Sequence, residues 1–181
     1  VAAPIDIGFL NDRPFVYVAA FGAFTKVAYD TPQDLKNTFG HLAYIFAGLA
    51  SLPTISPYHM KVVYDGQYLE DDFYFGMVSN AQSIGGIKPP KVDQVVLDDG
   101  LFEVTLVKKP LSLADLTDGL QALVNLSPAD RSGALVQFQG SSLTFTSSQS
   151  VPWTLDGEFG GSQPVNRVVN CQKALWVIHG E

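Results

Sequence analysis

The clearest structural signal in the chain is the stretch Tyr58-His59-Met60-Lys61-Val62-Val63-Tyr64-Asp65-Gly66. Apolar side chains alternate along it and put Met60, Val62 and Tyr64 on one face, which is typical of a half-buried β-strand. Asp65-Gly66 is one of the dipeptides that favour a two-residue hairpin turn. The stretch therefore predicts a strand followed by a tight reversal of the chain.

Other strand-like runs lie on both sides of this one. They cover residues 16–21, 73–78, 101–107, 143–146, 165–169 and 174–178. About ten strand candidates of this kind suit a β-sandwich or a barrel. Two helices are expected to interrupt them, because capping residues precede apolar side chains at helical spacing in residues 31–51 and 112–125. The expected fold is mainly β (α+β), a β-sandwich of about ten or more mostly antiparallel strands with two inserted helices.

Bulk composition limits the classes of function. The chain has 181 residues, of which 46% are apolar, so it is long enough for one domain, residues 1–181, with a real core. Its net charge of -7 argues against nucleic acid as a partner. A single cysteine excludes an internal disulfide and fits a reducing cytoplasm, and no apolar run has the ~18–20 residues of a membrane span. The start at Val1 without Met suggests a piece of a longer protein.

Two acidic signatures stand out. They are Asp98-Asp99-Gly100-Leu101-Phe102-Glu103-Val104 and Asp156-Gly157-Glu158, the latter followed by Phe159-Gly160-Gly161. Each joins carboxylates to a glycine turn, which suits holding a hard cation or accepting a proton beside a phosphate. No glycine loop that would cradle a phosphate is present. The pair predicts a phosphoryl-transfer site whose nucleotide-binding half lies elsewhere.

Asp156-Gly157-Glu158 has two interpretations. If residues 153–155 are the end of a strand and the side chains keep alternating beyond it, Asp156 and Glu158 point to the same face. One of the two carboxylates could then take a hydroxyl proton. Alternatively, Asp-Gly is simply good chemistry for a type I′ turn. The glycines after Phe159 give a flexible backbone where a substrate could approach closely.

The other polar motifs also have a functional and a structural interpretation. Asp99, with backbone carbonyls near Val96 and Leu101, could hold Mg²⁺, or could simply form an acidic turn before a strand. Asn80 with Gly85 and Gly86 could line a cleft for a polar head group, or could simply be residues that form a loop between two elements. Glu70-Asp71-Asp72 is interpreted as a solvated turn, Phe21 and Phe24 as core packing or an acyl-chain entry, and His41, His59 and His179 as structural or exposed.

Four motifs together resemble the C-terminal domain of bacterial diacylglycerol kinase-type lipid kinases, related to sphingosine kinases and NAD kinases. They are residues 11–24, Val78-Ser79-Asn80 with Gly85-Gly86, residues 98–104, and Asp156-Gly157-Glu158. They occur in the family's order and span nearly the whole chain. One departure is Asp-Gly-Leu-Phe-Glu-Val where the family has Asp-Gly-Leu-Leu-Asp-Val, which keeps an acid at Glu103.

The resemblance implies a division of labour between two domains. A Gly-Gly-Asp-Gly motif in an N-terminal domain, absent from this chain, would bind the co-substrate ATP, so the chain alone is expected to be inactive. Glu158 would be the acid/base residue, with Asp156 as helper or competing candidate. Mg²⁺ would lie at Asp99 and the main chain of Val96 and Leu101, and substrate near Asn80, Gly85 and Gly86.

The expected activity is phosphorylation of diacylglycerol to phosphatidic acid. Because that substrate is a membrane lipid, the protein is expected to be cytoplasmic and to contact the membrane surface transiently. An apolar face left by the absent domain would favour a homodimer. The alternatives are a kinase for another lipid or for a soluble acceptor such as NAD, and a noncatalytic sandwich that binds lipid.

Overall fold

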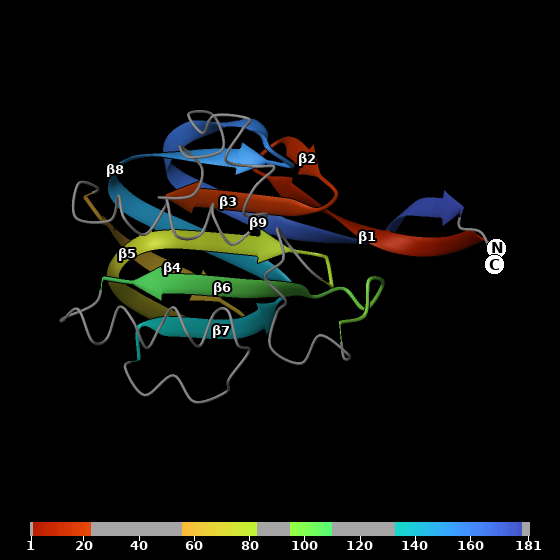
Figure 1. Cartoon of the computed structure of the whole chain (residues 1–181), viewed down its shortest axis with the longest axis horizontal. Coiled ribbons are helices and arrows are strands. Elements are labelled where there is room, and N and C mark those ends of the chain that lie inside the picture. Colours follow the sequence, from red (N-terminus) through yellow and green to blue (C-terminus); the bar gives the residue numbers. More distant parts are fainter. Residues whose placement is uncertain (1, 23–55, 83–94, 110–132, 179–181) are drawn as a thin grey trace, which may run out of the picture.

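The computed structural model describes residues 2–22, 56–82, 95–109 and 133–178, and in these ranges the chain forms nine β-strands and no helix (Figure 1). The strands are β1 (Ala2–Leu10), β2 (Arg13–Phe15), β3 (Val18–Gly22), β4 (Tyr58–Tyr64), β5 (Gln67–Ser79), β6 (Phe102–Lys108), β7 (Leu135–Gly140), β8 (Ser142–Leu155) and β9 (Glu158–Ile178). The expected helices, residues 31–51 and 112–125, lie outside the described residues, as do Phe24, His41, Gly85, Gly86 and His179.

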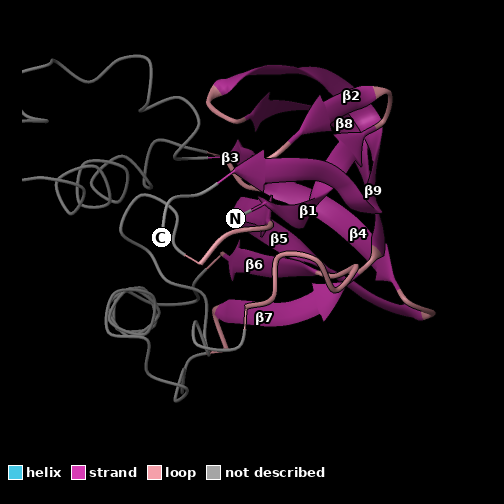
Figure 2. Cartoon of the chain, turned by 90° about the vertical axis from the view of Figure 1, so that its right-hand side faces the viewer, coloured by secondary structure: helices cyan, strands magenta, loops and turns pink. Residues whose placement is uncertain are grey.

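Every strand pairing in this part of the chain is antiparallel. The order across the sheet is β2-β1-β9-β8-β3-β5-β6-β7, and β4 pairs with both β5 and β8. Two short strands, β3 and β4, therefore lie between the long strands β5 and β8, each beside a different half of them. The long strands curve, so that the sheet folds over a core (Figure 2), which confirms the expected antiparallel sandwich.

Aromatic side chains fill the centre of this core. The Phe21 ring lies 4.9 Å from that of Trp153 and 6.0 Å from that of Phe145, and all three residues are fully buried. Edge-to-face and tilted contacts of this kind stabilise a core beyond the area they bury. The core-packing interpretation of Phe21 is therefore confirmed.

The stretch 58–66 folds as its pattern predicts. Met60 and Val62 are buried, and the Tyr64 ring stacks on that of Phe138 at 3.9 Å. Asp65 and Gly66 have φ angles of 43° and 80° and join β4 to β5 in a two-residue turn. The hairpin is thus set by local sequence.

Two sequence predictions are corrected by the structure. Residues 165–169 and 174–178 belong to one strand, β9, because β1 and β8 pair with it along its length. Glu70-Asp71-Asp72 is part of strand β5 and pairs with residues of β4, so it is no turn.

The ends of β1 and β9 form a two-stranded arm that projects from the rest of the sheet (Figure 1). The arm carries exposed apolar side chains at four successive positions of β9: Leu175, Trp176, Val177 and Ile178. The described residues contain no helix with the length and hydropathy needed to cross a membrane.

Candidate functional site

Four neighbouring strands, β8, β3, β5 and β6, begin or end at the same end of the sheet and bring both acidic signatures together there. We call this end of the strands the sheet edge. Val18, at the start of β3, pairs with Ser79 at the end of β5, and Ser79 pairs with Glu103 near the start of β6. On the other side of β3, Ala19 pairs with Leu155, the last residue of β8. The turn after β8, the loop before β3 and the loop before β6 are therefore spatial neighbours.

Asp156-Gly157 is a two-residue turn between β8 and β9. Leu155 pairs with Glu158 across it, and the φ angles of Asp156 and Gly157 are 51° and 92°. Positive φ at both central residues is the mark of a type I′ turn. The turn interpretation is confirmed, and the interpretation by strand alternation is wrong, because Asp156 is a turn residue.

The Asp156 carboxylate anchors the loop that connects β2 to β3. Its Oδ2 accepts the Val16 N–H at 2.8 Å, and its Oδ1 accepts the N–H groups of Tyr17 at 2.9 Å and Val18 at 2.8 Å. The Asp156 N–H donates to the Val18 carbonyl at 2.8 Å. Both carboxylate oxygens are thus engaged with successive backbone amides.

We expect Asp156→Ala to lower the free energy of unfolding by about 2 kcal/mol, since hydrogen bonds to a charged group contribute about 1.5–3 kcal/mol each and water replaces part of that. Amide exchange should accelerate at residues 16–18. Asp65→Ala is the matched control, because Asp65 also opens an Asp-Gly turn with positive φ but accepts only one side-chain hydrogen bond, from Ser141 at 3.3 Å. Equal losses in the two variants, measured by chemical denaturation, would contradict the anchoring role.

Glu158 has a different environment from Asp156. It is the exposed first residue of β9, and its side chain has no hydrogen bond or ion pair with the other described residues. The Arg13 guanidinium donates through Nη1 to the Phe159 carbonyl at 2.8 Å and so holds the backbone that follows. Glu158 therefore presents an open carboxylate next to a fixed turn.

The second acidic signature forms a loop against the arm of β1 and β9. The Asp99 Oδ1 accepts the Leu101 N–H at 2.9 Å, and Gly100 has a φ of 84°. The Asp98 carbonyl accepts from the Gln172 side chain at 2.9 Å, and its carboxylate lies 3.6 Å from the Lys173 ammonium. These contacts orient the loop and leave Asp99 exposed.

Asn80 connects the two signatures. Its backbone N–H donates to the Tyr17 carbonyl at 3.2 Å, and Tyr17 in turn donates its own N–H to Asp156. Its side-chain Nδ2 donates to the carbonyls of Asp6 and Leu97, each at 3.0 Å. Asn80 is buried, and its Oδ1 is a buried acceptor that has no hydrogen-bond partner among the described residues.

The chain matches the family described as the YegS C-terminal NAD kinase beta sandwich-like domain over residues 18–179. It belongs to this family. Two curated relatives of this YegS-type domain are named diacylglycerol kinase. The one from Bacillus subtilis (strain 168) is 30% identical over 98% of this chain, and the one from Staphylococcus carnosus (strain TM300) is 30% identical over 90%.

Solved structures agree on the fold. A diacylglycerol kinase from Bacillus anthracis str. Sterne matches with a TM-score of 0.65 and 19% identity over 99% of this chain and 55% of its own. Another protein from that organism, described as a candidate diacylglycerol kinase, matches with a TM-score of 0.74 and 21% identity, over 99% of this chain and 57% of its own. The chain spans 57% and 52% of the lengths of the two curated relatives, so about half of each relative has no counterpart here.

The acidic loop of this YegS-type domain offers only hard oxygen donors. They are the Asp99 Oδ2, the Asp98 carboxylate and the backbone carbonyls around them, on a loop that glycine and Asx hydrogen bonds hold in shape. Among the described residues there is no group of three or more His, Cys, Asp or Glu side chains that could hold a metal. The Asp98 carboxylate already lies beside the Lys173 ammonium, so Asp99 is the carboxylate available to a cation, and one carboxylate with carbonyls and retained waters is a donor set that Mg²⁺ can use.

Glu103 is a buried carboxyl directly after the acidic loop. Its Oε1 accepts from the Gln139 side chain at 3.1 Å, while its Oε2 has no partner among the residues described. Burial raises the pKa of Glu103, the hydrogen bond from Gln139 lowers it in part, and the charge of Asp99 raises it further. Folding therefore disfavours the ionised form of Glu103 relative to the unfolded chain.

We expect Glu103→Gln to stabilise the domain increasingly as the pH rises from about 4 to about 7. A carboxyl whose pKa is raised by folding loses its contribution to stability as pH climbs through the folded pKa, whereas glutamine stays neutral and its oxygen still accepts from Gln139. The gain should reach about 1 kcal/mol at neutral pH by chemical denaturation. A difference that stays flat or shrinks with pH would contradict this prediction.

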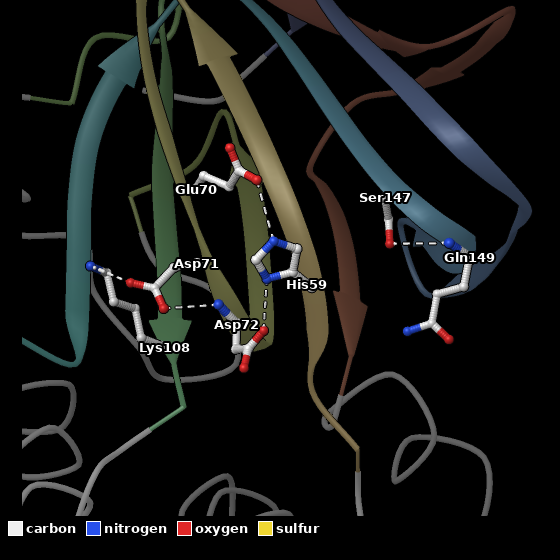
Figure 3. A network of polar contacts seen from close by, with 7 residues as sticks. All are labelled: His59, Glu70, Asp71, Asp72, Lys108, Ser147 and Gln149. Atoms are coloured by element: carbon white, nitrogen blue, oxygen red, sulfur yellow. Dashed lines mark hydrogen bonds and ion pairs between the residues drawn. The ribbon is translucent and has the colours of Figure 1, made fainter.

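Charged side chains lie on both faces of the β4–β5 hairpin (Figure 3). The His59 Nδ1 is 2.9 Å from Asp72 and its Nε2 is 3.3 Å from Glu70, while Lys108 is 2.9 Å from Asp71. Hydrogen bonds that the His59 ring donates to the carboxylates of Asp72 and then Glu70 raise the pKa of His59. Because these side chains are between 30% and 64% exposed, water screens their charges and the contacts contribute little to stability.

Sequence reasoning missed several residues at this sheet edge. The most important are Asp6, Gln172 and Lys173, which contact the acidic loop, and Asn170, which donates a hydrogen bond to Asp6. One signal for Asp6 was present in the sequence, a carboxylate between Ile5 and Ile7 in an apolar run. A buried polar side chain at such a position needs hydrogen-bond partners, which makes it a candidate for a structural or functional role.

Proposed function

We propose that this chain is the acceptor-activating part of a two-domain lipid kinase that transfers the γ-phosphoryl group of ATP to the hydroxyl of diacylglycerol. The names of the relatives support the class of reaction. The observation that carries the proposal is the open carboxylate of Glu158 beside the fully engaged carboxylate of Asp156, at a sheet edge shared with the acidic loop. An N-terminal domain outside this chain would bind ATP.

The proposed reaction divides the work between the two carboxylates. Glu158 accepts the proton of the acceptor hydroxyl while the hydroxyl oxygen forms a bond to the γ-phosphorus of ATP. The bond between that phosphorus and the β-γ bridging oxygen breaks, and ADP leaves. Asp156 holds residues 16–18 and so fixes the turn that carries Glu158. Most of the rate enhancement then comes from positioning.

Asp99, with the carbonyls of Val96 and Leu101, would hold Mg²⁺ at the acidic loop. A cation bound there supplies positive charge that balances Asp98 and Asp99 and favours the loop's folded shape. Asn80 would take part in substrate binding, together with Gly85 and Gly86, which lie outside the described residues.

Apolar side chains beside the turn suit a lipid acceptor. Val16, Tyr17 and Phe159 are 41%, 41% and 58% exposed, and they flank the Asp156-Gly157 turn. A polar acceptor such as NAD would require groups that read a base, whereas these side chains favour acyl chains or a bilayer surface. Transient contact of a cytoplasmic parent protein with the membrane surface is part of this proposal.

The exposed apolar arm of β1 and β9 fits a covered position in the larger protein. Trp176 and Ile178 are 65% and 86% exposed, and exposed apolar patches on a soluble domain are typical of interfaces. The missing domain would cover the arm in the parent protein, and a second copy would cover it when the chain is alone, as a homodimer.

The test is an acceptor comparison with the full-length parent protein. Labelled ATP and Mg²⁺ are supplied with diacylglycerol in mixed micelles, and with a sphingoid base and NAD in parallel reactions. Labelled phosphatidic acid is the expected product. Label on the sphingoid base or on NAD would mean that the protein is a kinase for that acceptor instead of diacylglycerol. No label on any acceptor would favour a noncatalytic sandwich that binds lipid.

A further inference from the structure

Asp6 is a buried carboxyl at an irregular point of the sheet. It is 0% exposed and lies in β1 between Ile5 and Ile7, where the register between β1 and β9 shifts. Ile5 pairs with Leu175 but Ile7 pairs with Cys171, so β9 bulges opposite Asp6. Bulges of this kind redirect side chains and are frequent beside functional sites.

Three donors from two other segments converge on the Asp6 side chain. Its Oδ2 accepts the Gly100 N–H at 2.6 Å and the Asn170 side-chain amide at 3.3 Å, and its Oδ1 accepts the Lys173 N–H at 2.7 Å. Lys173 has a φ of 56° and lies within the bulge. In the described structure Asp6 has no salt bridge, and the Lys173 ammonium lies beside Asp98 instead.

The backbone of Asp6 holds the same loop at its other end. The Asp6 N–H donates to the Leu97 carbonyl at 2.7 Å, and the Asn80 side chain donates to both the Leu97 and the Asp6 carbonyls. The loop is thus attached to Asp6 at Leu97 and again at Gly100. Asp98 and Asp99 are the two residues between these attachment points.

We propose that Asp6 is the positioning residue of the acidic loop 97–101, fixing where the carboxylates of Asp98 and Asp99 lie. We call the two attachments of Asp6 to this loop, at Leu97 and Gly100, the clamp. The hydrogen bonds show the clamp, and its importance for catalysis rests on the proposed function. An aspartate is required because both of its oxygens accept hydrogen bonds. In asparagine one of them becomes an NH₂ group, which would face either the Lys173 N–H or the Gly100 N–H and the Asn170 amide.

The first test uses hydrogen exchange of the full-length protein carrying Asp6→Asn. Peptides covering residues 97–101 should exchange faster than in the wild type, while peptides of β4 and β5 should be unchanged. Asp12→Asn is the matched control, since it removes the same charge from an exposed residue. Asn170→Ala removes only one of the three bonds and should produce a smaller change in the same peptides, which keeps the test available if Asp6→Asn does not fold.

The second readout is the dependence of phosphate transfer on Mg²⁺. We expect the half-saturating Mg²⁺ concentration to rise by about ten-fold or more in Asp6→Asn, with the rate largely recovered at saturating Mg²⁺, since residues that orient a metal site typically affect its affinity by that factor. A merely structural role would lower the rate and leave the half-saturating concentration unchanged.

The outcomes separate the inference from the proposed function. Unchanged exchange at residues 97–101 in both Asp6→Asn and Asn170→Ala would overturn the clamp. Faster exchange with an unchanged Mg²⁺ dependence would overturn its role in the reaction. If the wild-type protein transfers phosphate to no acceptor, the proposed function fails, and the exchange comparison alone decides whether Asp6 holds the loop.

Discussion

Glu158→Gln in the full-length protein is expected to lower the rate of phosphate transfer to diacylglycerol by about 10²–10⁴-fold, the usual contribution of a general base. Glutamine keeps the size and polarity of the side chain but cannot accept the hydroxyl proton. Because Glu158 is exposed and has no partner among the described residues, the fold should not depend on its charge. The thermal midpoint and the affinity for lipid micelles should therefore stay near the wild-type values.

Glu70→Gln is the matched control for this substitution. Glu70 is also an exposed glutamate on a strand, and its contact is with His59 on the outer side of the β4–β5 hairpin. We expect it to leave the transfer rate unchanged. A Glu158→Gln protein that is folded and retains the wild-type rate would exclude Glu158 as the base.

The largest effect on stability is expected for Gly22→Ala. Gly22 ends β3 with a φ of 94°, a conformation that is costly for any residue with a side chain. A Cβ at this position would overlap the Tyr74 carbonyl oxygen of the neighbouring strand β5, and a backbone oxygen in a paired strand cannot move aside. Strained φ and overpacking together should lower the free energy of unfolding by about 3 kcal/mol or more.

Gly66→Ala separates the two contributions to this effect. Gly66 has a φ of 80°, but a Cβ there would meet no atom within 4 Å. Gly66→Ala should lower the free energy of unfolding only by the conformational contribution, about 1 kcal/mol. Chemical denaturation of both variants gives the comparison, and equal losses would show that the contact with Tyr74 contributes nothing.

Local features of the fold were predictable because they depend on neighbouring residues. The alternation of residues 58–64 and the Asp65-Gly66 turn determine a hairpin without help from distant segments. The prediction for Glu70-Asp71-Asp72 was wrong because His59, opposite on β4, and Lys108, on β6, accommodate the acids in a strand. A run of acidic residues by itself does not reveal such partners.

The candidate site was predictable in its residues and not in its architecture. Turn chemistry indicated a bend at Asp156-Gly157, but the partners of Asp156 come from residues 16–18, more than a hundred residues earlier in the chain. Only the order β8-β3-β5-β6 brings these segments together. The role of Asp6 depends in the same way on a bulge in β9 that no local pattern specifies.

The central claim is that Asp156 is committed to holding the loop while Glu158 is free to take the acceptor's proton. A crystal structure of the full-length protein with a non-hydrolysable ATP analogue and diacylglycerol tests it most directly. The account predicts the acceptor hydroxyl at about 2.6–3.2 Å from the Glu158 carboxylate, with Asp156 still bound to the amides of residues 16–18. A hydroxyl bound by Asp156, with Glu158 directed away from the acceptor, would contradict it.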